Sequence, residues 1–311
     1  PLIFIYIIKY VKYTDMSKTK YNTAIFFAVL AASLYAFSFP FSKIILDKVP
    51  PTMMAGLLYL GAGLGMSAVG LFRRATGKVN KEMKITRKEI PFTIGMVVLD
   101  IAAPIFLMIG LTMTTPENAS LLSSFEIVAT SLIAFFIFNE PINKKLWIGI
   151  IFITLASIIL SVDGINSFYF SLGSVFVVFA CVCWGFENNC TRTLSIKDPL
   201  EVVIIKGFGS GFGALLIAFF IHQISADTVY IIAALLLGFV SYGLSIYFYV
   251  YAQRELGAAK TSAYYSVSPF IGVLFSFIVF REKTEISFFF ALSFMLIGTY
   301  LAFNDKEQRS V

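Results

Sequence analysis

Four ionisable side chains lie inside long apolar stretches of this sequence: Asp100, Glu126, Glu187 and Lys206. If those stretches cross a bilayer, each charged group costs several kcal/mol to bury, or at least about 2.5 kcal/mol on insertion scales, unless it faces a partner or a wet cavity. Glu187 and Lys206 fall at similar depth on adjacent antiparallel stretches, so we expect that they can form an ion pair. The sequence leaves open whether that pair only fixes packing or takes part in a mechanism.

Glu126 is the strongest single candidate for binding a proton or a cation. It lies near the middle of its stretch, and burial of a carboxylate favours its protonated form. A proton and a cationic solute would then compete for one site. A hydrogen-bonded Glu126 that never titrates is the alternative.

Aromatic and helix-breaking residues supply further candidates. Tyrosine and tryptophan rings can stack on an organic solute or hold a cation against a ring face, although packing is their commoner role. Prolines inside a helix free backbone carbonyls, which is tolerated where the helix lines a cavity, and they are also common packing kinks. The aromatic candidates are Tyr35, Trp184, Tyr242, Tyr264 and Tyr265; Ser268 is a polar candidate, and the hinge candidates are Pro40, Pro104 and Pro269.

Enzyme chemistry is disfavoured by what the sequence offers. The single histidine, His222, lies at the end of an apolar stretch, and no serine or cysteine has a plausible histidine partner. Cys181, Cys183 and Cys190 are too closely spaced to build a tetrahedral metal site, and no glycine-rich phosphate loop is present. We therefore expect no enzymatic activity, no metal and no cofactor.

The composition explains how these residues are positioned. Of 311 residues, 58% are hydrophobic and 14% are charged, whereas soluble proteins are roughly half apolar and about a quarter charged. The apolar stretches approach the roughly 20 residues that cross a bilayer as a helix, and they lack the alternation of a membrane barrel. The sequence predicts an all-α polytopic membrane protein with ten spans: 23–46, 51–72, 90–111, 118–138, 146–163, 171–191, 201–222, 228–252, 260–280 and 286–303.

Basic residues orient these spans. Lys and Arg concentrate in alternate connections and near both chain ends, most densely between spans two and three, whereas the opposite side holds only Lys48, Arg281 and Lys283. The positive-inside rule then places both termini in the cytoplasm of a multi-pass protein of the cytoplasmic (plasma) membrane. The net charge of +6 needs no nucleic-acid partner.

An internal repeat organises the chain. A shift of 149 residues places Tyr35 over Trp184 and Lys43 over Arg192, and a shift of 142 places Phe138–Glu140 over Phe280–Glu282. Each half has five spans, and because five is odd the second half enters the membrane inverted. We expect an N-terminal extension at 1–22 with Met16 as a possible natural start, repeats at 23–163 and 164–303, and a cytoplasmic tail at 304–311.

Short motifs in both halves accompany this repeat: Ala119–Leu122, Phe138–Pro141, Gly149–Ser157, Trp184–Arg192, Ala263, Ser268–Pro269, Phe280–Glu282 and Gly298. With these motifs, the chain resembles the EamA-type ten-helix branch of the drug/metabolite transporter superfamily, from about Thr23 to Phe303. Many members have a proline after the residue that matches Glu126, where this chain has Ile127, so the sequence supplies no proline for a kink there. The repeat partner Pro269 is kept.

The resemblance implies a monomeric carrier that works without ATP and has a central cavity between the repeats. We therefore expect a secondary active transporter for a small organic metabolite or drug-like solute, working by alternating access with protons as the candidate coupling ion. Three buried acids against one or two bases favour a cationic or zwitterionic solute. A channel or facilitative pore is the alternative function, with an integral-membrane enzyme behind it; the expected partners are the solute and membrane lipid.

Overall fold

The computed structural model describes residues 18–76, 85–138, 142, 144–161, 171–194, 197–256, 261, 264–281 and 285–308. The possible start at Met16 lies outside these residues. So do Asn139–Pro141, Ala263 and Glu282 of the motifs that carry the resemblance.

The described residues form helices and contain no strand, which confirms the predicted all-α fold. Eight helices or helix groups are long and apolar enough to cross a membrane, and two shorter apolar helices, Ser268–Phe280 and Ile286–Ala302, complete the ten predicted spans. The helices are α2 (Lys18–Ala36), α3 (Ser38–Ile45), α4 (Pro51–Ala75), α5 (Ile90–Met113), α6 (Pro116–Leu122), α7 (Phe125–Phe138), α8 (Lys144–Ser161), α9 (Leu172–Leu194), α10 (Pro199–Phe220), α11 (Thr228–Gly238), α12 (Ser245–Leu256), α14 (Ser268–Phe280) and α15 (Ile286–Gln308), with a 3₁₀ turn η1 (Arg87–Glu89) and a π-helix η2 (Phe239–Leu244).

The prolines explain where several helices begin or break. Pro40 has no N–H for the carbonyl four residues before it, and the first span breaks just there, at Phe37 between α2 and α3. Pro269 lies in the first turn of α14, so it starts a helix instead of kinking one; its missing N–H costs nothing there. Pro104 alone lies inside a continuous helix, α5.

The fourth span breaks without a proline. A turn at Ser123–Ser124 separates α6 from α7, immediately before Glu126. The Ser123 hydroxyl donates to the Ser120 carbonyl at 2.6 Å, and such side-chain bonds compete with the regular helical ladder. The absence of a proline at Ile127 therefore does not remove the break in this span.

The packing of the helices follows the inverted repeat. The partners α4 and α10 pack together, as do α6 and α14, and α8 and α15. The contact of α5 with α9 is matched by the contact of α12 with α2, and that of α7 with α9 by that of α14 with α2. This exchange of partners is what a pseudo-two-fold axis between the two halves requires.

Glycines bring the axis-related helices close together. A side chain at Gly63 of α4 would stand 3.0 Å from the backbone nitrogen of Phe208 in α10. One at Gly149 of α8 would stand 2.8 Å from the carbonyl oxygen of Gly298 in α15. Spans two and seven therefore pack closely, and the last span of each half packs in the same way.

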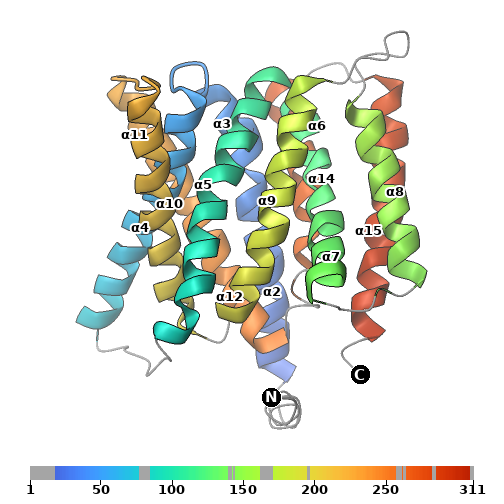
Figure 1. Ribbon diagram of the computed structural model, residues 1–311, viewed down its shortest axis with the longest axis horizontal. Coiled ribbons are helices and arrows are strands. Elements are labelled where there is room, and N and C mark those ends of the chain that lie inside the picture. The colour runs from blue at the N-terminus through green and yellow to red at the C-terminus, as the bar shows by residue number, and fades with distance from the viewer. Residues whose placement is uncertain are drawn as a thin grey trace.

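Both ends of the described chain lie on one face of the bundle. Figure 1 shows the start of α2 and the end of α15 at the bottom, together with the end of α4 and the start of α5. The basic connection between spans two and three therefore joins helices on the same side as both chain ends. This agrees with the orientation expected from the positive charges.

Candidate functional site

A buried ion cluster joins the two halves of the protein. Lys206 Nζ of α10 lies 2.9 Å from Glu187 Oε1 of α9 and 3.1 Å from Asp100 Oδ2 of α5. The Tyr59 hydroxyl donates to Asp100 Oδ1 at 2.8 Å, and the Thr191 hydroxyl donates to Glu187 Oε1. Asp100 is 0% exposed and Lys206 only 5%, so all of the charge is inside the protein.

The expected ion pair between Glu187 and Lys206 is present, but it is part of a three-membered cluster. Asp100 joins it because α5 packs along α9 and also contacts α10. The sequence placed Asp100 at mid-depth and gave no signal for the pairing of its helix with α9.

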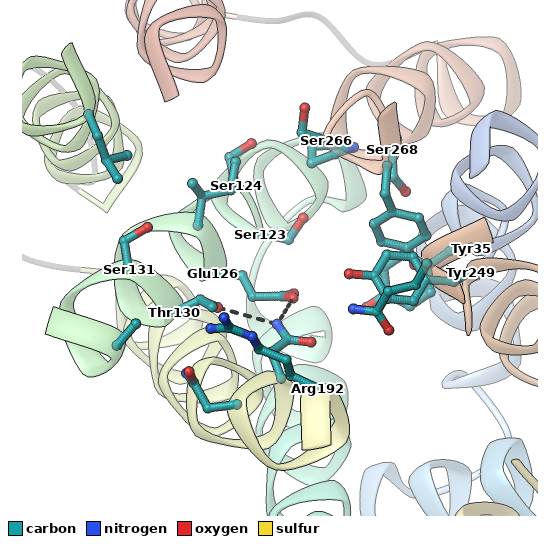
Figure 2. A pocket seen from close by; sticks show the side chains of 18 of the residues that line it. Tyr35, Ser123, Ser124, Glu126, Thr130, Ser131, Arg192, Tyr249, Ser266 and Ser268 are labelled. Carbon is teal, nitrogen blue, oxygen red and sulfur yellow. Dashed lines mark hydrogen bonds between the residues drawn. The ribbon is translucent and has the colours of Figure 1, made fainter. Parts of the chain in front are cut away.

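A separate cavity of about 380 Å³ opens between α2, α7, the last part of α9, α12 and the start of α14. Its walls come from both halves of the chain, as Figure 2 shows. The lining residues are Tyr35, Ser123, Ser124, Glu126, Ile127, Thr130, Ser131, Ala134, Ile142, Leu146, Asn188, Asn189, Arg192, Tyr249, Gln253, Tyr265, Ser266, Ser268 and Pro269.

Glu126 lies on one wall of the cavity in a polar setting. Asn188 Nδ2 donates to Glu126 Oε1 at 2.6 Å and approaches Thr130 Oγ1 at 3.3 Å. Arg192 follows Asn188 one helical turn later on α9 and lines the same wall, beside the Glu126 group in Figure 2. Arg192 thus brings a positive charge into the cavity that Glu126 lines.

Tyrosines form the opposite wall. Tyr265 is central, with ring centroids 6.1 Å from Tyr35 and 4.9 Å from Tyr249, and Figure 2 shows Tyr35 and Tyr249 across the cavity from Glu126. Behind this wall the Tyr35 ring contacts Tyr242 at 5.7 Å and Trp184 at 6.3 Å.

The structure thus divides the predicted residues into three groups. Glu126, Tyr35, Tyr265, Ser268 and Pro269 line the cavity. The buried cluster of Asp100, Glu187 and Lys206 lies outside that lining, as do the second-layer rings of Trp184 and Tyr242. Tyr264 packs instead against Ala24, Ala28, Ala252 and Leu256, and neither Pro40 nor Pro104 lines the cavity.

Several lining residues were not singled out from the sequence. Asn188 and Arg192 are four residues apart and therefore share one face of α9, which was the available signal for this wall. Tyr249 and Gln253 stand in the same relation on α12, but nothing in its sequence showed which face turns inward. Serines 123, 124, 131 and 266 carried no signal of their own.

The side of the cavity away from the chain ends is closed by direct contacts. Ser120 Oγ of α6 donates to the Pro269 carbonyl at 2.8 Å, and Ser268 Oγ donates to the Ala32 carbonyl at 2.9 Å. Beyond them, Lys43 Nζ of α3 donates to the carbonyls of Leu111 and Thr114 at 2.5 and 3.0 Å, where α5 ends.

Comparison with known families identifies this arrangement. A model of the EamA-like transporter family matches the chain twice, over residues 22–162 and 171–304. The chain belongs to the EamA-like transporter family. It is therefore a multi-pass membrane transporter, as expected from the resemblance to the drug/metabolite transporter superfamily.

Relatives of this EamA-like transporter carry general names. It is 26% identical over 291 residues to an uncharacterized transporter of Methanothermobacter thermautotrophicus, covering 88% of this chain and 84% of the relative. It is 23% identical over 223 residues to the uncharacterized transporter YyaM of Bacillus subtilis, covering 65% of this chain and 72% of the relative. These names, like the family, indicate a transporter and not an enzyme.

A solved structure shares the fold of the EamA-like transporter. It is described only as the crystal structure of a protein, and it superimposes with a TM-score of 0.64 at 16% sequence identity. The match covers 92% of this chain and 96% of the other.

Proposed function

We propose that this protein is a secondary active transporter that moves a small zwitterionic metabolite across the cytoplasmic membrane by alternating access. One observation carries the proposal: an acidic and a basic side chain, Glu126 and Arg192, line the same cavity. A wall of tyrosines faces them. A cationic solute, which the sequence favoured equally, fits less well because Arg192 would repel it.

The cavity chemistry supports a zwitterion of modest size. An ammonium group of the solute pairs with Glu126, and its carboxylate accepts hydrogen bonds from the guanidinium of Arg192, which suits the planar shape of both groups. The apolar part lies against the rings of Tyr35 and Tyr265, which also favour cationic groups on their faces. The volume of about 380 Å³ falls in the usual range of small-molecule sites.

Alternating access is supported by the unequal closure of the two sides. Asn188, Arg192 and Gln253 come from the last parts of α9 and α12, towards the face that carries both chain ends. The other face is closed by the hydrogen bonds that Ser120, Ser268 and Lys43 donate. With the predicted orientation this is a cytoplasm-facing state, and in an inverted repeat the two halves can exchange their arrangements to face outwards.

Proton coupling is part of the same proposal. Glu126 can hold either the ammonium group of the solute or a proton, so the two compete and transport is linked to the proton gradient. We propose that the carrier works as a monomer with membrane lipid around it, because the cavity is built within one chain.

A thermal-shift screen tests the substrate class. Purified protein is heated with amino acids, simple amines, carboxylic acids and quaternary ammonium compounds, since a ligand stabilises the state that binds it. We expect stabilisation by an amino acid, loss of that stabilisation in Glu126→Gln and in Arg192→Gln, and no loss in the exposed cytoplasmic-side control Lys144→Gln. Stabilisation by amines alone, unaffected by Arg192→Gln, would overturn the zwitterion proposal.

Flux measurements distinguish the carrier from the channel or pore. In vesicles, a carrier shows saturable uptake and counterflow when unlabelled solute is loaded on the opposite side. Unitary currents, or flux that never saturates, would instead favour the pore.

A further inference from the structure

We propose that Asp100, Glu187 and Lys206 form a proton-binding site, which holds one proton between its two carboxyl groups and is separate from the cavity. The site would take a proton alone. Lys206 Nζ already occupies the place between the carboxylates, at 2.9 and 3.1 Å, so no metal ion can enter there. Among the described residues no group of His, Cys, Asp and Glu is arranged to hold a metal.

The first argument is the charge of the cluster. Fully ionised, two carboxylates and one ammonium group leave a net charge of −1 in side chains that are at most 6% exposed. A net charge in the interior of a membrane protein is costly. One proton, bound as a carboxylic acid, makes the cluster neutral while Lys206 remains charged and paired with the other carboxylate.

Within the part of the chain that the structure describes, the titratable groups near Asp100 supply no second positive charge. The titratable groups near Asp100 are Lys206 of α10, Glu187, Cys183 and Cys190 of α9, Tyr59 of α4 and Tyr242 of η2. Thiols and phenols are neutral at physiological pH. The hydroxyl groups of Tyr59 and Thr191 donate to Asp100 and Glu187 respectively, which orients both carboxyl groups without changing the charge.

The two carboxyl groups act together because they share one ammonium group. Both contact the same ammonium group, so the protonation of one determines how strongly the other is paired. The proton belongs to the cluster and not to a single residue. It leaves as the pH rises, when the carboxylic acid becomes a carboxylate and the cluster takes up its net charge.

The position of the cluster connects it with the transport cavity. Its members come from both halves of the chain, and Glu187 precedes Asn188, the cavity residue that donates to Glu126. A chain of tyrosine ring contacts, from Tyr59 to Tyr242 at 5.1 Å and from Tyr242 to Tyr35 at 5.7 Å, also connects the cluster with the cavity wall. Pro104 has no N–H for the Asp100 carbonyl, so α5 is able to bend beside the site.

Infrared spectroscopy of the full-length protein in lipid vesicles tests the proposal without a transport substrate. The measurement follows the carbonyl band of buried carboxylic acids as the pH is raised. All samples carry Glu126→Gln, because the proposed function gives Glu126 a proton of its own. We expect a pH-sensitive band in this background that is lost when either Asp100→Asn or Glu187→Gln is added, because either change leaves one carboxylate neutralised by Lys206. Glu117→Gln, which removes a carboxyl group outside the cluster, is the matched control and should keep the band.

The outcomes separate clearly. A Glu126→Gln protein without the band, or a band that survives when either Asp100→Asn or Glu187→Gln is added to it, overturns the proposal. If those variants fail to fold, Tyr59→Phe provides the test. Loss of its hydrogen bond destabilises the ionised form of Asp100, so the band should persist to higher pH. An unchanged midpoint in the pH dependence of the band overturns the proposal. The role in transport rests on the proposed function, but these measurements do not, so the two can fail independently.

Discussion

At the scale of single residues, the protein keeps two sets of charges apart. The cavity is lined by both an acid and a base, Glu126 and Arg192, at a surface that solute can reach. The cluster around Lys206 holds its charges inside the bundle, where each depends on its neighbours. Changes in the first set should alter transport, whereas changes in the second should also alter stability.

Removal of Lys206 should destabilise the protein more than any cavity substitution. Lys206→Met leaves two buried carboxyl groups uncompensated, and breaking a buried ion pair costs about 3–5 kcal/mol. The added change Glu187→Gln should restore part of that loss, and the triple variant with Asp100→Asn most of it. Thermal unfolding in one detergent measures all three. Additive losses would show that the three residues do not act together.

Glu126→Gln should uncouple transport from the proton gradient. The amide keeps the size of the side chain and a carbonyl that accepts from Asn188, but it binds no proton and no longer attracts an ammonium group. We expect loss of pH-driven uptake or efflux in vesicles while residual exchange of solute survives. Unchanged pH-driven transport would place the coupling elsewhere, with the Lys206 cluster as the first place to look.

At the scale of elements, the broken helices set the geometry of the cavity. The breaks at Phe37 and Ser123–Ser124 and the start of α14 at Ser268 let short helices meet at the outer side, while their continuations diverge around the cavity. The π-helix η2, which contains Tyr242, is a similar irregularity. Such segments occur often at functional sites. The short helix α3 is held to α5 by Lys43.

Lys43→Met should loosen the outer closure. It removes two hydrogen bonds from a charged donor, each worth about 1.5–3 kcal/mol, at the end of α5. In a variant free of native cysteines, labelling of Ser38→Cys by an impermeant maleimide from outside should become at least about tenfold faster. Lys48→Met, an exposed lysine three residues beyond α3, is the control, and an equal effect there would contradict the closure.

At the scale of the whole molecule, two similar halves build an asymmetric site. The repeat explains the paired helix contacts and the glycine approaches on its axis. Its symmetry does not extend to charge, since Glu126 on one half has the uncharged Ser268 as its counterpart and both line one cavity. The asymmetry allows one end of a solute to be distinguished from the other.

Cysteine labelling in intact cells checks the orientation of the bundle. Positions 81 and 144 should react only from the cytoplasm, and positions 166 and 227 only from outside, because the Lys and Arg residues are concentrated on the first side. Lys144 begins α8 and Asp227 precedes α11, and Figure 1 shows these two helices starting on opposite faces of the bundle. The reverse pattern would turn the cavity towards the exterior.

The sequence by itself determined the ten helical spans, their inverted repeat and the pairing of Glu187 with Lys206. These follow from composition and spacing, which act along one helix or between neighbours. Tertiary structure alone decided that Asp100 joins Lys206, that Arg192 lines the cavity of Glu126, and that the fourth span breaks at Ser123–Ser124. Helices that are apolar on every side show no preferred face, so only their packing determines which polar side chains meet.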